Sequence, residues 1–238
     1  MIDVFRRGVI SASAFALLTA ASIAAGEEDR PGAWGVVTVG GPLGEPTTRG
    51  RWNIGVDAQA RYFDIGTGIS QWLLRPSIGY RYTDGLDLRV GYGRFRTRAA
   101  GGLVVNEDRL FQDLALPLVY SASGEFDVRV RLEQRFVDIS SDVAHVLRTR
   151  FRYRRPVGNS DYSIEAHYEA FFGLNDTDWT GSSRLAQWRL YLGAGRPVGR
   201  VRLELGYLYQ PLDREIGEDF GNHLAIFRID YRFGSKRS

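Results

Sequence analysis

Three titratable side chains at alternate positions could act together chemically. Glu165, His167 and Glu169 share one face if their segment is a β-strand, because successive side chains of a strand point to opposite faces. Two carboxylates and an imidazole on one face could bind a divalent metal ion. They could instead form ion pairs with the arginines at alternate positions from Arg148 to Arg154. So many guanidinium groups would repel a cation, which favours ion pairs and predicts neither a metal nor another cofactor.

His145 is the second candidate for chemistry, since it follows a polar loop at residues 140–142 that offers two serines and an aspartate. A serine, a histidine and an acid at the rim of a barrel could hydrolyse lipids of the outer leaflet. However, Val143 and Leu147 occupy the positions two residues away on the same strand face. We therefore predict no catalytic residue and no enzyme activity, with His145 at the membrane interface and a lipid hydrolase as the alternative.

Both candidates belong to a chain that alternates with a period of two from Arg51 to Phe233. One parity carries Arg, Asp and Glu, and the other carries aliphatic and aromatic residues, which is typical of strands with one charged and one apolar face. We expect about ten strands, over residues 51–63, 70–83, 86–97, 108–121, 125–137, 143–155, 161–173, 183–195, 200–210 and 222–233. The fold class is therefore all-β. Because the open edges of a sheet promote aggregation, we expect the strands to close into an antiparallel up-and-down barrel, with twelve strands as the alternative to ten.

The first 25 residues differ from the rest of the chain. Arg6 and Arg7 precede an uncharged run of small and apolar residues. This pattern predicts that residues 1–25 are a signal peptide for export, cleaved near residues 22–25, with an N-terminal membrane anchor as the alternative.

The remaining chain divides into three parts. Residues 26–50 are rich in Gly and Pro and are expected to form a periplasmic or luminal segment or an extra edge, with a short strand at 33–39. The β-barrel then occupies residues 51–233, and a C-terminal tail follows at 234–238. Short turns alternate with longer loops, which is the habit of outer-membrane barrels, and ten strands would place both ends of the barrel on the short-turn side.

Composition excludes several classes of protein. The chain of 238 residues has no cysteine, which excludes disulfides and thiol chemistry. Its formal charge is only +3, and its arginines alternate with acids along the strands, which argues against nucleic acid as a partner. The mean hydropathy is −0.24, and no internal apolar run reaches the roughly 18 residues that a membrane helix needs. A spanning strand, however, needs only about ten residues, half of them polar.

The position of the aromatic residues predicts which face points outward. On the apolar parity they gather near strand ends, whereas the residues between them are mostly aliphatic or small. The two predicted belts contain Trp52, Tyr80, Tyr82, Tyr120, Phe126, Tyr153, Tyr162, Tyr231 and Phe233 at one end, and Tyr62, Trp72, Phe136, Phe172 and Tyr209 at the other. Aromatic belts around an aliphatic band are typical of a lipid-facing surface. We therefore expect a monomer in the bacterial outer membrane, in contact with its lipid; a soluble periplasmic barrel that binds an apolar ligand is the alternative.

The charged parity would then line the lumen. Arginine outnumbers the carboxylates there, and Lys236 is the only lysine of the chain. The planar fork of arginine suits pairing in a crowded interior. We predict a luminal charge network of Arg131, Glu133, Arg135, Arg148, Arg150, Arg152, Glu165, His167, Glu169 and Arg189. This lumen predicts a porin-like, narrow, anion-preferring channel or a plugged barrel with a structural or interaction role.

Several short segments also carry a family resemblance. They are Asp57–Tyr62, Leu74–Tyr80, Gly91–Gly93, Glu107–Gln112, Arg131–Phe136, Glu169–Asn175, Gly206–Tyr207 and Asn222–His223. In this order the chain resembles an uncharacterised family of Gram-negative outer-membrane β-barrels, domain of unknown function 2490. The final Tyr231-Arg232-Phe233 is similar to the signal that the barrel-assembly machinery recognises, which implies that machinery as a partner during biogenesis. The resemblance implies an outer-membrane barrel and no particular activity.

Overall fold

The computed structural model describes residues 28–121, 123–180, 185–212 and 220–234. The predicted signal peptide and most of the predicted tail therefore lie outside the described residues. The described chain contains one short 3₁₀ turn, Ala100–Gly102, and no helix in it is long and apolar enough to cross a membrane. Its strands are β1 (Glu28–Leu43), β2 (Gly50–Asp64), β3 (Ile69–Tyr82), β4 (Asp87–Arg98), β5 (Val104–Ser121), β6 (Gly124–Val137), β7 (Ala144–Pro156), β8 (Ser163–Gly173), β9 (Leu185–Val198), β10 (Val201–Leu212) and β11 (Phe220–Arg232).

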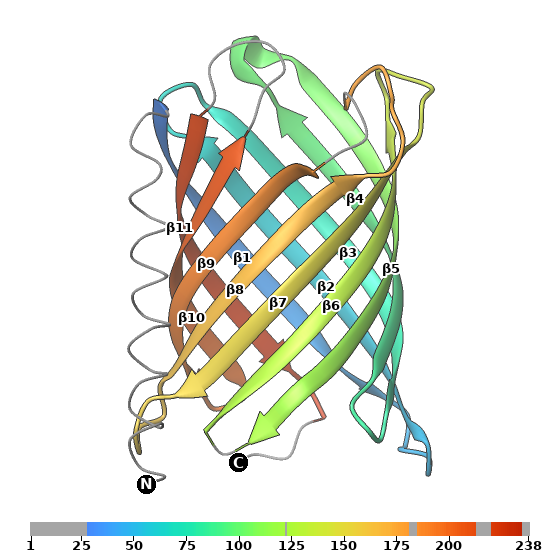
Figure 1. Ribbon diagram of the computed structural model, residues 1–238, viewed down its shortest axis with the longest axis vertical. Coiled ribbons are helices and arrows are strands. Elements are labelled where there is room, and N and C mark those ends of the chain that lie inside the picture. The colour runs from blue at the N-terminus through green and yellow to red at the C-terminus, as the bar shows by residue number, and fades with distance from the viewer. Residues whose placement is uncertain (1–27, 122, 181–184, 213–219, 235–238) are drawn as a thin grey trace, which may run out of the picture.

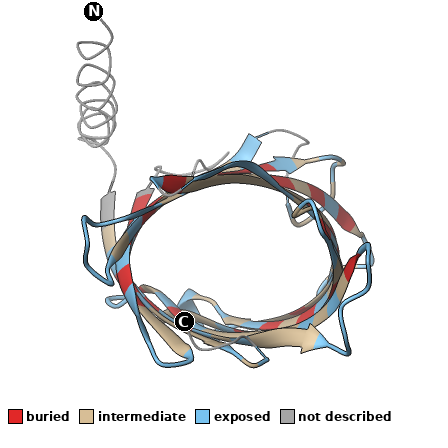
Figure 2. Ribbon diagram, turned by 90° about the horizontal axis from the view of Figure 1, so that it is seen from below, coloured by how far each residue is buried: buried red, intermediate tan, exposed pale blue. Residues whose placement is uncertain are grey.

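The eleven strands of the described chain form one closed barrel (Figures 1 and 2). Consecutive strands pair antiparallel, whereas β1 and β11 pair in parallel and close the wall. This parallel pair follows from the count, because an odd number of alternating strands leaves its first and last strands running in the same direction. The predicted numbers of ten or twelve strands are therefore wrong, although the all-β barrel is confirmed.

The additional strand is β1, which lies within the segment that the sequence analysis placed outside the ten-stranded wall. Its glycines and prolines conceal it, because both residue types are depleted in strands. Two of these glycines are required by the close approach of the neighbouring strands. A Cβ atom at Gly32 would lie 2.2 Å from the carbonyl oxygen of Tyr62, and one at Gly41 would lie 2.4 Å from that of Phe233.

The two ends of the barrel can be distinguished by their connections. The short-turn end carries the connections 44–49, 83–86, 157–162 and 199–200, and β11 finishes there. The loop end carries the connections 65–68, 99–103 and 138–143 and the one between β8 and β9. Because β1 begins at the loop end, the two ends of the barrel's chain lie on opposite sides, and the expectation of both on the short-turn side is wrong.

Inner and outer faces of the wall have the reverse polarity of a soluble protein. Charged side chains that point inward are buried, with Glu133 and Glu165 each only 1% exposed. Aliphatic side chains that point outward are exposed, as is Leu205 at 66%. The exposed outer aliphatic residues include Val37, Val39, Ile54, Val56, Leu74, Ile78, Leu88, Val90, Leu110, Leu114, Leu192 and Leu205.

Outward aromatic rings contact one another near both ends of the wall. At the short-turn end the ring centroids of Trp52 and Tyr80 are 5.2 Å apart. Towards the loop end those of Trp188 and Tyr209 are 5.6 Å apart. The separation into belts is incomplete, because Phe151 is also exposed on the outer face and pairs with Val128 of the aliphatic band.

One sector of the lumen is apolar, which the sequence analysis did not anticipate. We call it the seam cluster; it contains Trp34, Val36, Tyr191, Leu208, Leu224 and Ile226, from β1, β9, β10 and β11. Tyr191 lies flat against two glycines, since a Cβ atom at Gly193 or Gly206 would lie 2.1 or 2.4 Å from its hydroxyl oxygen. The parallel closure of the barrel is thus packed from inside by large apolar side chains.

Candidate functional site

The structure places the ten predicted network residues on the inner faces of β6, β7, β8 and β9. Alternation along each strand accounts for this, because residues of one parity share a face. The register then brings Arg148 of β7 between Glu133 of β6 and Glu169 of β8, at 2.5 and 2.8 Å. Arg152 lies 3.7 Å from Glu165 and 2.5 Å from Asp127.

Two carboxylates are shared by many arginines. Glu133 lies 2.7 Å from Arg135 and also contacts Arg109, Arg131 and Arg148. Glu169 is similarly shared by Arg129, Arg148 and Arg189. These two acids, with Glu107 and Asp113 as further partners, serve six arginines, so positive charge is in excess on this side of the lumen. We call the inner faces of β5 to β8 the ionic wall.

Towards the short-turn end, Glu165 is the centre of a second group of ion pairs. It lies 2.5 Å from Arg154 and 3.5 Å from Arg228. His167 stacks on Tyr191 with ring centroids 4.6 Å apart, and its Nδ1 lies 3.5 Å from Glu165. Within the described residues, no group of three His, Cys, Asp or Glu is placed to hold a metal ion.

Aromatic rings hold several luminal arginines from the side. The guanidinium carbon of Arg109 lies 3.8 Å from the ring centroid of Phe95, and that of Arg148 lies 4.4 Å from Phe171. Such stacking is favourable because the ring face is electronegative. It also leaves the edge of the guanidinium fork available for hydrogen bonds.

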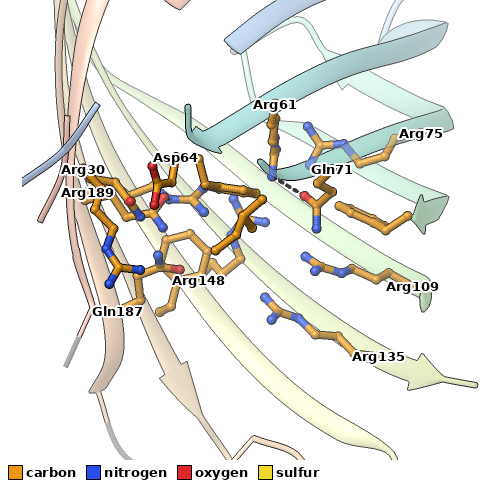
Figure 3. A pocket seen from close by; sticks show the side chains of 16 residues that line it. Arg30, Arg61, Asp64, Gln71, Arg75, Arg109, Arg135, Arg148, Gln187 and Arg189 are labelled. Carbon is orange, nitrogen blue, oxygen red and sulfur yellow. Dashed lines mark hydrogen bonds between the residues drawn. The ribbon is translucent and has the colours of Figure 1, made fainter. Parts of the chain in front are cut away.

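The loop-end half of the lumen contains a cavity of about 280 Å³, which the ionic wall borders on one side (Figure 3). Among the described residues, its lining includes one carboxylate, Asp64, and seven arginines: Arg30, Arg61, Arg75, Arg109, Arg135, Arg148 and Arg189. Arg109 and Arg135 extend into the space from one side and Arg189 from the other (Figure 3). Amides of Gln71, Gln187, Gln210 and Asn222 and the rings of Phe63, Phe95 and Phe171 complete most of the lining.

Arg61 and Arg189 differ from the other cavity arginines in their partners. Arg61 hydrogen-bonds to the side-chain oxygens of Gln59 and Gln71, at 2.8 and 2.9 Å, and both partners are neutral. Arg189 donates to Gln210 at 2.8 Å, and its contact to a carboxylate is a longer 3.9 Å. Both guanidiniums lie over the ring of Trp34, at 4.3 and 5.2 Å from its centroid.

The aromatic side of this site was not predicted from the sequence. Trp34, Phe95, Phe111, Phe171 and Tyr191 all lie on the charged parity of their strands and point inward. Large apolar residues on the parity otherwise occupied by charge were the available signal. Glycines on the same parity were another, because a Cβ atom at Gly91 would lie 2.2 Å from the ring of Phe111.

His145, the candidate for rim catalysis, is exposed on the outer face of β7. Its backbone N–H donates to the side-chain oxygen of Asn175 at 2.7 Å. The hydroxyl of Ser140 donates to Asp178 instead, at 2.6 Å. No hydrogen bond links the ring of His145 to Ser140 or Asp142, both of which lie in the described part of the chain.

The fold and this site define a closed β-barrel with a charged, net-basic interior and an apolar exterior. Residues 31–221 match the family described as protein of unknown function (DUF2490), and the chain belongs to this family. An uncharacterized protein of Methylorubrum extorquens is 30% identical to it over 175 residues, which cover 71% of this chain and 77% of the relative. No solved structure matches the chain.

Proposed function

We propose that this protein is an outer-membrane β-barrel whose narrow lumen interacts with anions and prefers them to cations. The observation that carries the proposal is the inverted polarity of the wall, with exposed aliphatic side chains outside and buried charges inside. Water would solvate such an exterior poorly, whereas lipid tails match it. A closed barrel also satisfies the backbone hydrogen bonds of every strand, which a lipid environment requires.

Strand length supports the same location. The shortest strand, β8, has 11 residues and the longest, β5, has 18. A tilted transmembrane strand needs about 9–11 residues. Each strand is therefore long enough to cross a bilayer, and the longer ones would continue beyond it.

The charge of the cavity supports a preference for anions. Seven arginines and one carboxylate of the described chain line the space, and the carboxylates behind the arginines are shared. A field of one sign between low-dielectric walls concentrates ions of the opposite sign. Chloride or a small organic anion would therefore be admitted more readily than potassium.

A second function is favoured by the burial of the luminal carboxylates. Glu133, Glu165 and Glu204 are at most 2% exposed, although carboxylates along a wide aqueous pore would be wet. A barrel plugged by its own side chains would have a structural or interaction role. Other luminal side chains are partly exposed, among them Asp57 at 22%, Arg89 at 23% and Arg152 at 24%, so water reaches part of the lumen.

Two experiments test the proposal. Membrane fractionation of a Gram-negative host and heat-dependent mobility in detergent gels should place the protein in the outer membrane as a folded barrel; recovery in the soluble periplasm would refute this. Planar bilayers under a KCl gradient should then show small conductance with a reversal potential towards that of chloride. Silence would favour the plugged barrel, and cation selectivity would contradict the basic lumen.

A further inference from the structure

The loop-end cavity has the composition of a ligand site rather than of filled space. We propose that it binds a small soluble organic anion with at least two acidic groups, held chiefly by Arg61 and Arg189. This inference rests on the proposed function in one respect: the outer-membrane location decides from which side of the membrane the ligand arrives. Binding itself depends only on the folded lumen.

The arrangement of charges is the first argument. Arg61 is buried, with 7% exposure, and its guanidinium donates hydrogen bonds to the neutral amide oxygens of Gln59 and Gln71. A buried charge without an opposite charge is costly, and proteins normally pair it. Arg189 lies over the same indole ring, so two guanidiniums share Trp34, and no carboxylate of the described residues lies close between them. A dianionic ligand would neutralise this pair, and the planar forks suit carboxylate or phosphate oxygens.

Unpaired polar atoms near these arginines are the second argument for a bound ligand. The indole N–H of Trp34 has no hydrogen-bond partner among the described residues, although Trp34 is only 6% exposed. The side-chain oxygen of Asn222, which lines the cavity and is 1% exposed, also lacks one. Buried polar groups are rarely left unsatisfied, so each is a candidate contact for a bound molecule.

The volume limits the size of the ligand. Pockets for drug-sized molecules measure about 300–1,000 Å³, and this cavity measures about 280 Å³. The occupant is therefore smaller than a drug-sized molecule, and citrate is a suitable probe with its three carboxylates. The rings of Phe63, Phe95 and Phe171 and the side chain of Ile69 make part of the cavity wall apolar, which suits a carbon skeleton, whereas inorganic phosphate would leave that part unused.

Titration calorimetry on the folded barrel in detergent micelles tests the site, with citrate, inorganic phosphate and acetate as probes. We expect one citrate per barrel, bound more tightly than phosphate and at least about tenfold more tightly than acetate, because each additional charged hydrogen bond contributes about tenfold or more. The double substitution Arg61→Gln with Arg189→Gln should weaken the binding of citrate at least about tenfold. Arg96→Gln, on the exposed outer face of β4, should leave binding unchanged.

Heat-dependent gel mobility of every variant separates lost binding from lost folding. Replacing both arginines by lysine keeps the charge but removes the fork, so citrate affinity should fall less than with glutamine. Absence of citrate binding by the parent protein, or equal affinity in the glutamine variant, would overturn the proposed site. Outer-membrane fractionation and anion-selective conductance would survive that result, so the two proposals can fail separately. If phosphate bound more tightly than citrate, the proposal that the ligand is an organic anion would be overturned.

Discussion

The two sides of the lumen are stabilised by different physics. The ionic wall on β5 to β8 is a layer of arginines and carboxylates that lie within 4 Å of one another, whereas the seam cluster on β1 and β9 to β11 is apolar. Apolar packing is non-directional and tolerates the parallel register of β1 and β11. Ion pairs require exact partners, and a network with more arginines than acids retains net charge. The seam cluster therefore closes the barrel, and the ionic wall provides its field.

Ligand binding belongs where these two regions meet. Arg61 and Arg189 rest on Trp34, which is a member of the seam cluster, and Arg189 also reaches Glu169 of the ionic wall. The aromatic ring holds the guanidiniums in place without neutralising them. This boundary is the part of the lumen where charge is fixed in position and yet poorly compensated.

Glu133→Gln should have the largest effect on stability, because four arginines would lose a shared buried carboxylate. Removing one partner from a buried ionic group costs about 3–5 kcal/mol. Urea unfolding in detergent micelles, followed by tryptophan fluorescence, would measure the loss. Glu45→Gln, in the exposed β1–β2 turn, is the matched control and should change little. If Glu133→Gln left the stability unchanged or raised it, the ionic wall would not depend on this shared carboxylate.

Leu224→Ala tests the seam cluster in the same assay. Leu224 is fully buried in the lumen at 0% exposure, so the substitution creates a cavity and should cost about 2–5 kcal/mol. Leu205→Ala is the control from the neighbouring strand, because this side chain points outward and its removal leaves no enclosed cavity. A larger loss for Leu205→Ala would contradict the assignment of the two faces.

The ionic wall was largely predictable from the sequence and the seam cluster was not. Alternation fixes which side chains share a face, so Arg148 and Glu169 could be placed in the lumen from local pattern alone. The seam cluster depends on β1, whose glycines and prolines resemble a linker, and on a parallel pairing between residues about 190 positions apart, such as Trp34 and Ile226. The cavity depends on side-chain lengths at one height on many strands, which no local pattern encodes.

Gly193→Val would distort the seam cluster without removing any of its members. The new side chain would meet the hydroxyl of Tyr191, which also donates to Glu204 at 2.7 Å. Overpacking of this kind costs about 1–3 kcal/mol. Adding Tyr191→Phe removes the clashing oxygen, so the double variant should lose less stability than the sum of the single variants. Additive losses in urea unfolding would refute the direct contact.

Asp138→Asn, at the exposed loop-end rim, should have the smallest effect on stability, in contrast to Glu133→Gln in the buried lumen. The side chain of Asn106 donates to the Asp138 carboxylate at 2.6 Å, and this bond lowers the pKa of Asp138 below its usual value of 3.8. A lowered pKa contributes stability above the usual value and loses it as the pH falls through the lowered one. The small difference in thermal midpoint between parent and variant should therefore be present at about pH 7 and vanish in strong acid. Asp161→Asn, in an exposed turn at the other end, controls for general loss of charge, and a pH-independent difference would contradict the bond. Comparable charges would then be worth little at the rim and much in the ionic wall, because exposure to water, rather than pairing alone, sets the value of an ion.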